Sequence, residues 1–235
     1  MNTIAIITAR GGSKRIPGKN IKEFCGKPIL SYSIKAALDS KIFDTVMVST
    51  DDEKIADIAV RYGAEVPFFR SAKTSDDFAT TGDVIMEVLE EYEKRKRLFD
   101  LAACIYPTAP FITSDKLKTA VELLKDSDAD TVIPVVGFSY PPQRALHEVN
   151  GILEPVYPEN MNMRSQDLEK HYHDVGQFYF FRTDRFKLNK SLMSGKVLPL
   201  FISELEMQDI DNVIDWKMAE LKYRLLINEG IIKNA

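Results

Sequence analysis

Near its amino terminus the chain reads Thr3-Ile4-Ala5-Ile6-Ile7-Thr8-Ala9-Arg10-Gly11-Gly12-Ser13-Lys14-Arg15-Ile16-Pro17-Gly18-Lys19-Asn20, an apolar run followed by a glycine-rich basic loop. Residues 4–7 are all apolar, which is typical of a parallel strand covered on both faces. The loop therefore lies at the carboxyl edge of a sheet, where open α/β folds bind ligands. Gly11 and Gly12 allow a sharp turn that brings backbone N–H groups near a ligand. The basic side chains of the loop suit phosphate oxygens: Arg10, Lys14, Arg15 and Lys19. We predict a nucleoside triphosphate site here, with a basic surface turn as the alternative.

Two well-known phosphate motifs do not fit this loop. A Walker loop has four residues between its first glycine and the Gly-Lys pair, whereas Gly12 and Gly18 enclose five, and Asn20 stands where Ser or Thr is required. The dinucleotide fingerprint G-x-G-x-x-G is also absent, which argues against a nicotinamide-dependent enzyme.

Apolar strands and amphipathic helices alternate along the rest of the chain. Further strands are expected at residues 45–49, 101–106, 130–136, 176–181 and 198–202. Apolar side chains recur at helical spacing in residues 29–38, 84–92, 117–124 and 213–226. Thr50-Asp51-Asp52-Glu53 reads as a capping box that starts another helix, ended by Gly63. The alternation predicts one α/β domain over residues 1–235, with a mostly parallel Rossmann-like sheet flanked by helices.

The alternation is interrupted at residues 138–172, which are rich in proline and aromatic residues. Within them, residues 146–156 are expected to form a hairpin that turns at Asn150-Gly151. We predict that this segment is an insertion in the domain.

Composition narrows the class of protein. With 235 residues and 45% hydrophobic content, the chain can bury one large core. The formal net charge is only −4 and basic residues do not cluster, so nucleic acid is not an expected partner. No apolar segment approaches the roughly 20 residues of a membrane span, and no signal peptide is evident, so we predict a cytoplasmic protein without membrane contact. Cys25 and Cys104 imply no disulfide framework, and the three histidines have no zinc-site spacing.

The loop at residues 9–20 resembles the signature loop of the cytidylyltransferases that activate nine-carbon acidic sugars, a family that includes the CMP-sialic acid synthetases. Further matching segments follow in order at residues 48–51, Arg70 with 75–81, 106–110 and 208–211. The resemblance covers nearly the whole chain and implies the fold of the nucleotide-diphospho-sugar transferases. Residues 140–146 and 172–180 are most similar to the branch that makes CMP-pseudaminic acid.

The resemblance also implies which residues bind CTP: Ala9, Arg10, Gly11, Gly12, Ser13, Lys14, Lys19, Asn20, Arg70, Ala79 and Thr81. The resemblance gives Arg10 and Lys19 catalytic roles, in which Lys19 stabilises the negative charge on the departing pyrophosphate. Asn20, Arg70 and Ala79 fall where the family reads the cytosine ring. Arg70 could equally be a surface residue that pairs with Asp76 or Asp77, and Thr81 could simply begin a helix.

Asp209 and Asp211 are separated by one residue, so in an extended segment both side chains project from one face. Such a carboxylate pair suits Mg²⁺, with Mn²⁺ as a substitute, and Asp211 would act in catalysis through the metal. As an alternative, Asp211 or Asn212 is the N-cap of the helix that follows. Asp174 or His173 could instead serve as the general base.

Residues for the sugar are implied mainly in the second half of the chain: Tyr106, Arg144, Arg164, His173, Gln177 and Tyr179. Arg144 and Arg164 suit a carboxylate because a guanidinium offers two parallel hydrogen bonds, although either could hold a subunit interface instead. Tyr106 and His173 stand where the sialic acid enzymes carry glutamine and arginine. Aromatic residues in a sheet, such as Tyr179, more often belong to the core.

Together these observations predict an enzyme, a nucleotidyltransferase that converts CTP and pseudaminic acid to CMP-pseudaminic acid and diphosphate, for surface glycan or flagellin glycosylation. A CMP-sialic or CMP-legionaminic acid synthetase is the alternative within the family. A nucleotide-sugar-dependent glycosyltransferase or a nucleotide-sugar-binding protein is the alternative of another class, and the basic loop argues against both. In the family the insertion reaches a second subunit, which implies a homodimer; a lid within one subunit is the other interpretation.

Overall fold

Strand β1 (Thr3–Thr8) lies inside a seven-stranded sheet. The computed structural model describes residues 1–232 of the chain. β1 pairs in parallel with β4 (Thr45–Ser49) on one side and with β5 (Leu101–Ile105) on the other. Residues 4–7 have no exposed surface, as expected for a strand covered on both faces. The apolar run therefore forms the predicted buried parallel strand.

The sheet continues beyond β5 in a mixed pattern. Its order is β11-β6-β10-β5-β1-β4, and β9 pairs with β6. The strands on this side are β6 (Thr131–Gly137), β9 (Tyr172–Asp174), β10 (Phe178–Arg182) and β11 (Val197–Phe201). β11 is parallel to β6, whereas β10 runs antiparallel to both β5 and β6. The reversal brings the amino end of β10 to the edge where β1 and β5 end.

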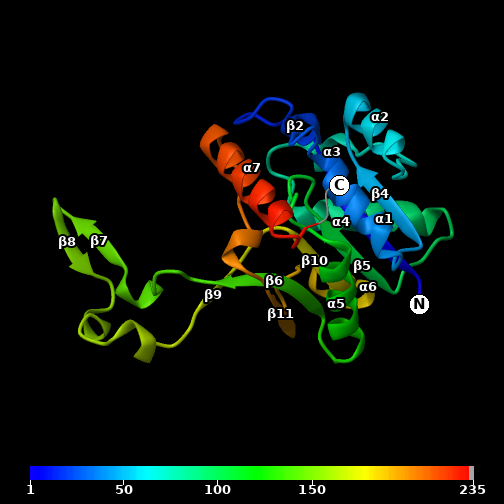
Figure 1. The fold of residues 1–235 in the computed structure, drawn as a ribbon. Coiled ribbons are helices and arrows are strands. Elements are labelled where there is room, and N and C mark those ends of the chain that lie inside the picture. Colours follow the sequence, from blue (N-terminus) through cyan, green and yellow to red (C-terminus); the bar gives the residue numbers. More distant parts are fainter. Residues whose placement is uncertain (233–235) are drawn as a thin grey trace.

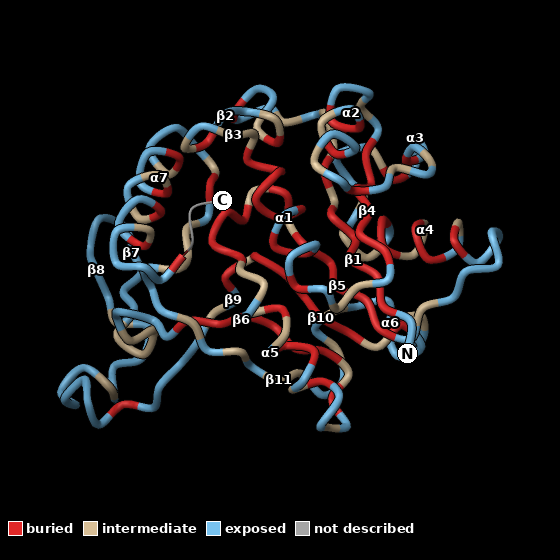
Figure 2. The backbone as a smooth tube through the Cα atoms, turned by 45° about the vertical axis from the view of Figure 1, so that its right-hand side comes forward, coloured by how far each residue is buried: buried red, intermediate tan, exposed pale blue. Residues whose placement is uncertain are grey.

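Helices cover both faces of the sheet (Figure 1). They are α1 (Leu30–Ser40), α2 (Glu53–Arg61), α3 (Ala72–Ser75), α4 (Thr81–Lys94), α5 (Ser114–Lys125), α6 (Thr183–Asn189) and α7 (Val213–Asn228). Apolar side chains of α1 and α5 form one core layer with the sheet, and those of α4 and α6 form the other. The buried strands run through the centre of the molecule in Figure 2. The predicted α/β fold with helices on both faces is confirmed.

Helix α7 packs outside these two layers. Its buried side chains join a third cluster with Phe24 of the short strand β2 (Glu23–Phe24), which pairs with β3 (Lys27–Pro28). Phe24 lies at the centre of this cluster, with its ring edge-on to Tyr32 at 5.5 Å and to Trp216 at 5.7 Å. The cluster attaches the start of α7 to the segment that follows the basic loop.

The predicted capping box at residues 50–53 is wrong in its details. Asp52 is the N-cap of α2, because its carboxylate accepts from the backbone N–H groups of Lys54 at 2.8 Å and Ile55 at 3.0 Å. A true capping box starts α4 instead, between Thr80 and Asp83. Thr50 and Asp52 are both residue types that favour the N-cap position, and their spacing in the sequence did not show which of them caps α2.

Residues 138–172 are called the arm below. Most of the arm projects away from the sheet, and Tyr172 at its end already belongs to β9 (Figure 1). The hairpin has strands β7 (Leu146–Val149) and β8 (Ile152–Pro155), and it turns at Asn150 and Gly151 with positive φ angles of 53° and 83°. Positive φ at both central residues is what a two-residue hairpin turn requires. Short 3-10 turns complete the arm: η2 (Pro142–Arg144), η3 (Pro158–Asn160) and η4 (Ser165–Asp167). The predicted hairpin is confirmed.

Two further expectations concern the described part of the chain. Cys104 is fully buried, and both Cys25 and Cys104 are free thiols, so the expectation of no disulfide is confirmed for these residues. Within residues 1–232, none of the helices has the length and apolar character that crossing a bilayer demands.

Candidate active site

A cavity of about 540 Å³ opens at the sheet edge where β1 and β5 end. It lies between the basic loop and the segment around residues 70–81, and we call it the first cavity. The residues that line it are Thr8, Arg10, Ser13, Lys14, Arg15, Lys19, Asn20, Arg70, Thr74, Asp76, Asp77, Ala79, Thr80, Thr81, Val84, Tyr106, Pro107 and Thr108. Eight of the residues implied to bind CTP are in this set, and Ala9, Gly11 and Gly12 are not.

Gly11 packs closely against the residues that precede α2, a contact that the sequence did not indicate. Its backbone N–H donates to Asp51 Oδ1 at 2.8 Å, so this donor is already used within the protein. A Cβ at Gly11 would lie only 2.9 Å from Asp52 Oδ2, whereas a Cβ at Gly12 would meet nothing within 4 Å. The bare backbone at Gly11 therefore lets the basic loop pack against the start of α2.

Two cations of the loop are held by one carboxylate. Arg10 Nη1 lies 3.0 Å from Asp77 Oδ1, and Lys14 Nζ lies 2.5 Å from Asp77 Oδ2. The hydrogen bond from Lys14 lowers the pKa of Asp77. Arg10 also donates to the backbone carbonyl of Asp76 at 2.9 Å. The sequence interpretation missed this contact, although it marked residues 75–81 as similar to the family.

The inner end of the first cavity is built from buried polar groups. Arg70 is buried, and it donates from Nε to Ser49 Oγ at 3.1 Å and from Nη2 to the Ser49 carbonyl at 2.7 Å. Burial lowers the pKa of Arg70. The alternative that Arg70 is a surface partner of Asp76 or Asp77 is therefore wrong. Asn20 is also buried, and its Nδ2 donates to the Arg10 carbonyl at 2.8 Å.

Lys19 stands at the boundary of this cavity. It begins the short turn η1 (Lys19–Ile21), and its Nζ donates to the Ile210 carbonyl at 2.6 Å. Burial lowers the pKa of Lys19, and the negative charges of Asp211 and Asp209 partly oppose that shift. The side chain thus joins the basic loop to the acidic segment near the carboxyl end of the chain.

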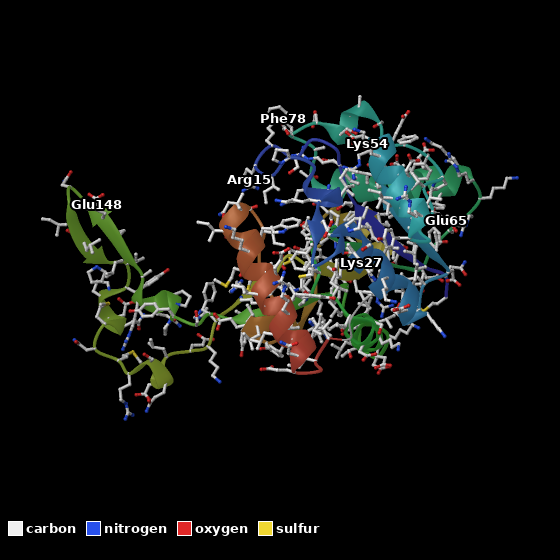
Figure 3. The ribbon with its side chains drawn as sticks, turned by 45° about the horizontal axis from the view of Figure 1, so that its top comes forward. Arg15, Lys27, Lys54, Glu65, Phe78 and Glu148 are labelled. Carbon is white, nitrogen blue, oxygen red and sulfur yellow. The ribbon has the colours of Figure 1, made fainter. Side chains whose placement is uncertain are left out.

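A buried residue separates the two carboxylates of the acidic segment. Ile210 is 2% exposed and packs into the α7 cluster. In an extended segment the neighbours of a buried residue project to the opposite face, so we expect Asp209 and Asp211 to share that face. Asp211 Oδ2 lies 2.6 Å from Arg15 Nη1, and Figure 3 shows Arg15 beside the start of α7. Asn212 is the N-cap of α7, so the helix cap does not need Asp211.

This donor set fits a magnesium ion. Mg²⁺ in proteins commonly takes one or two carboxylates and completes its shell with water and substrate phosphates. Asp209 and Asp211 supply such a pair next to the basic loop. Among residues 1–232 no group of three or more His, Cys, Asp or Glu side chains could hold a metal by itself, so the remaining ligands would come from substrate and water.

Side chains from α5, from α7 and from the loop before β10 hold the segment before these carboxylates. Lys116 Nζ pairs with Glu206 Oε1 at 2.8 Å, and their side chains are only 12% and 17% exposed. Glu206 ends the turn η5 (Glu204–Glu206), and its carbonyl accepts from Gln177 Nε2 at 2.6 Å. Lys222 Nζ donates to the Met207 carbonyl at 2.9 Å. The irregular backbone before Asp209 is therefore fixed by long-range contacts.

A second cavity of about 490 Å³ adjoins the first. It is lined by Lys19, Tyr106, Thr108, Ala109, Phe111, His173, Asp174, Val175, Gly176, Gln177, Met207, Gln208 and Asp209. Lys19, Tyr106 and Thr108 line both cavities. The two cavities therefore meet at the half-buried side chain of Lys19 and the ring of Tyr106.

The residues expected at the sugar fall into two groups. Tyr106, His173 and Gln177 line the second cavity, and Tyr179 lies buried behind it, where its hydroxyl donates to Asp174 Oδ2. The other two, Arg144 and Arg164, belong to the arm and line neither cavity of this chain. Arg164 pairs locally with Asp167 at 2.7 Å, and Arg144 donates to the Met163 carbonyl.

This arrangement can hold two reactants side by side with one cation, Lys19, at their junction. Group transfer between bound molecules gains most from such fixed proximity, and charge that develops during transfer is stabilised by preorganised donors. Displacement at phosphorus depends almost entirely on these two effects. The geometry therefore suits phosphoryl or nucleotidyl transfer from a triphosphate in the first cavity to an acceptor in the second.

Comparison with known proteins agrees with this chemistry. The sequence matches the protein family described as Cytidylyltransferase over residues 4–215. It is 39% identical over 227 residues to the pseudaminic acid cytidylyltransferase of Campylobacter jejuni subsp. jejuni serotype O:2, with 96% of this chain and 97% of that protein covered. It is 32% identical over 223 residues to the CMP-N,N'-diacetyllegionaminic acid synthase of Legionella pneumophila subsp. pneumophila, with 94% and 95% covered. The solved structure of CMP:2-keto-3-deoxy-manno-octonic acid synthetase complexed with CTP has a TM-score of 0.71 at 18% identity, over 97% of this chain and 100% of that chain, which shows a shared fold.

Proposed function

Because the chain belongs to the cytidylyltransferase family, we propose that it joins the cytidylyl group of CTP to the acidic nine-carbon sugar pseudaminic acid and releases diphosphate. The observation that carries the proposal is the position of Lys19, which lines both cavities at their junction. The choice of sugar follows the relative from Campylobacter jejuni, which is similar to this chain over nearly its full length.

In the proposed reaction the first cavity holds CTP and the second holds the sugar. Arg10, Lys14 and Lys19 bind the triphosphate, and Lys19 neutralises charge as diphosphate departs. Asn20 and Arg70 form the polar inner end that receives the cytosine ring, together with the backbone at Ala79. The first cavity, at about 540 Å³, has room for the base, the ribose and the phosphates together.

Asp209 and Asp211 would hold Mg²⁺, with Mn²⁺ as a substitute. When bound, the ion supplies charge neutralisation at the phosphates and lowers the pKa of the attacking hydroxyl. Support for this assignment comes from the burial of Ile210 between the two carboxylates and from the electrostatic effect of both carboxylates on Lys19.

We propose that the arm forms a homodimer with a second copy of the chain. It exposes apolar side chains that a lone chain leaves in water, such as Ile152 and Leu153 at 64% and 65% exposure. Arg144 and Arg164 lie on this arm, so a partner's second cavity is where they would meet the sugar carboxylate. We further expect a cytoplasmic enzyme whose product serves glycosylation of surface glycans or flagellin.

Diphosphate release from CTP across a panel of sugars tests this function. The purified chain is expected to form CMP-pseudaminic acid, identified by mass, with one diphosphate for each sugar consumed. Turnover of legionaminic or sialic acid without pseudaminic acid would move the chain to another branch and keep the reaction class. Release of CMP from a CMP-sugar onto an acceptor, without use of CTP, would instead indicate a glycosyltransferase.

A further inference from the structure

Asp174 is a carboxylate of the second cavity whose orientation is fixed from both sides. It ends β9, and its Oδ1 accepts from the Gly176 backbone N–H at 2.8 Å. Its Oδ2 accepts from the hydroxyl of Tyr179. Within residues 1–232 no lysine, arginine or histidine forms an ion pair with it. Each oxygen keeps acceptor capacity beyond these contacts.

The donor that orients Asp174 is itself held rigidly. Tyr179 lies in β10 and is buried, and its ring packs edge-on against Tyr106 at a centroid distance of 5.7 Å. Burial raises the pKa of Tyr179, so its hydroxyl stays protonated and remains a donor. Tyr106 in turn has its hydroxyl 3.3 Å from Thr81 Oγ1 at the first cavity. Asp174 is therefore preorganised by a chain of hydroxyl groups in the wall between the cavities.

The charges of the second cavity determine which part of an acidic sugar can face Asp174. Among residues 1–232 of a single chain, Lys19 is the only lysine or arginine that lines this cavity, and Asp174 and Asp209 are the carboxylates. A sugar carboxylate is repelled by Asp174 and attracted to Lys19. In a 2-keto sugar acid the carboxylate is attached to the same carbon as the reacting hydroxyl, so that end lies near Lys19. The opposite end, with its hydroxyl and acylamino groups, is left for Asp174.

We propose that Asp174 is a substrate-binding residue that accepts hydrogen bonds from hydroxyl or acylamino N–H groups of the sugar, and that Tyr179 is the positioning residue that fixes it. This assignment rests on the proposed function, because it takes the occupant of the second cavity to be an acylamino sugar acid. A carboxylate acceptor favours ligands that present donors and rejects those that present a second negative charge.

Steady-state kinetics of two nearly isosteric variants test the assignment. Asp174→Asn keeps the size of the side chain and removes its charge, and Tyr179→Phe removes only the hydroxyl. Each is expected to raise KM for the sugar, by about tenfold or more for Asp174→Asn, as expected when a charge-assisted hydrogen bond is lost. KM for CTP should stay within about twofold. Tyr92→Phe is the matched control, because Tyr92 is buried, lines neither cavity and has no hydrogen-bond partner for its hydroxyl within the described chain.

The double variant Asp174→Asn with Tyr179→Phe distinguishes a positioning role of Tyr179 from a general effect of its hydroxyl on protein stability. If Tyr179 acts through Asp174, Tyr179→Phe should change KM for the sugar much less in the Asp174→Asn background than in the wild type. Additive effects, unchanged KM for the sugar in Asp174→Asn, or an equal rise of KM for CTP would each overturn the assignment while the wild type remains active. A wild type that releases no diphosphate with any acidic sugar would overturn the proposed function itself, and the role of Asp174 with it.

Discussion

The partial burial of Lys19 changes the pKa of its amino group, and this change allows a test of its role in the reaction. Burial lowers its pKa from the ordinary 10.5, so its positive charge is lost at a lower pH than in an exposed lysine. The pH profile of kcat/KM for CTP reports ionisations of the free enzyme. We expect kcat/KM to fall on the alkaline side with an apparent pKa below 10.5. In Lys19→Arg the guanidinium stays charged, so this limb should disappear even if the overall rate is lower. An identical alkaline limb in both proteins would contradict the role of Lys19.

Asp77 forms ion pairs with Arg10 and Lys14, the two cations that the proposed function assigns to the triphosphate. Because CTP must compete with this carboxylate for Arg10 and Lys14, removal of the charge should improve CTP binding. Asp77→Asn is expected to lower KM for CTP by about two- to fivefold, since the pairs are solvent-exposed and screened. Asp128→Asn, which breaks an exposed pair with Lys196 far from the cavities, should leave KM unchanged. A higher KM in Asp77→Asn would mean that Asp77 orders the cations for the nucleotide.

Removal of divalent metal tests the acidic pair. Chelation with EDTA is expected to stop diphosphate release, and added Mg²⁺ or Mn²⁺ to restore it. Asp209→Asn and Asp211→Asn should each raise the Mg²⁺ concentration for half-maximal rate by about tenfold or more. Asp184→Asn, on α6, serves as a control outside both cavities. Full activity in EDTA would contradict a metal-dependent reaction.

Residue types and spacing predicted which side chains surround the first cavity, because Arg10, Lys19 and Asn20 belong to one local loop. Local rules did not predict the bond between Lys14 and Asp77, which are 63 positions apart. They also did not predict that Asp51 takes the N–H of Gly11, since that contact depends on the packing of β4 beside β1.

At the scale of elements, the pair of Lys116 on α5 and Glu206 in η5 anchors the segment that leads to Asp209. Lys116→Met leaves a mostly buried carboxylate without its partner, which should cost about 3 kcal/mol in the free energy of unfolding. Urea unfolding measures the loss, and Lys116→Met with Glu206→Gln should recover part of it. Lys187→Met breaks an exposed Lys–Glu pair of the same 2.8 Å length and should cost less than about 1 kcal/mol. Equal losses in the two single variants would contradict the anchoring role.

Most elements were predicted within a few residues, because apolar runs and helical spacing are local signals. The direction of β10 was not, since a strand buried on both faces has the same composition whether it runs parallel or antiparallel. Helix α6 (Thr183–Asn189) was missed because only two of its seven residues are buried, too few to show a helical period.

At the scale of the whole molecule, the proposed homodimer can be tested by changing the arm. Ile152→Ser with Leu153→Ser should convert a dimer into a monomer in light scattering, because both exposed apolar side chains would lose their partner surface. If the arm also carries the arginines to a partner's cavity, KM for the sugar should rise while KM for CTP stays constant. Leu188→Ser, at an exposed apolar position on α6, is the control and should remain dimeric. A monomeric wild type would contradict the proposed dimer.

The hairpin of the arm was predictable because Asn150-Gly151 is a strong local turn signal. A partner surface for the arm was not predictable in the same way, because local sequence patterns describe the folding of one chain and not its contacts with a second copy. Figures 1 and 3 show the arm standing apart from the body of the molecule. Arg144 and Arg164 lie on this arm and line neither cavity of their own chain.

A crystal structure of the complex with CTP would test the central claim most directly. We predict density for the triphosphate against Arg10, Lys14 and Lys19, with the cytosine ring at Asn20 and Arg70 and the α-phosphate directed toward the second cavity. CTP bound elsewhere, or with its phosphates remote from Lys19, would contradict the assignment of the two cavities.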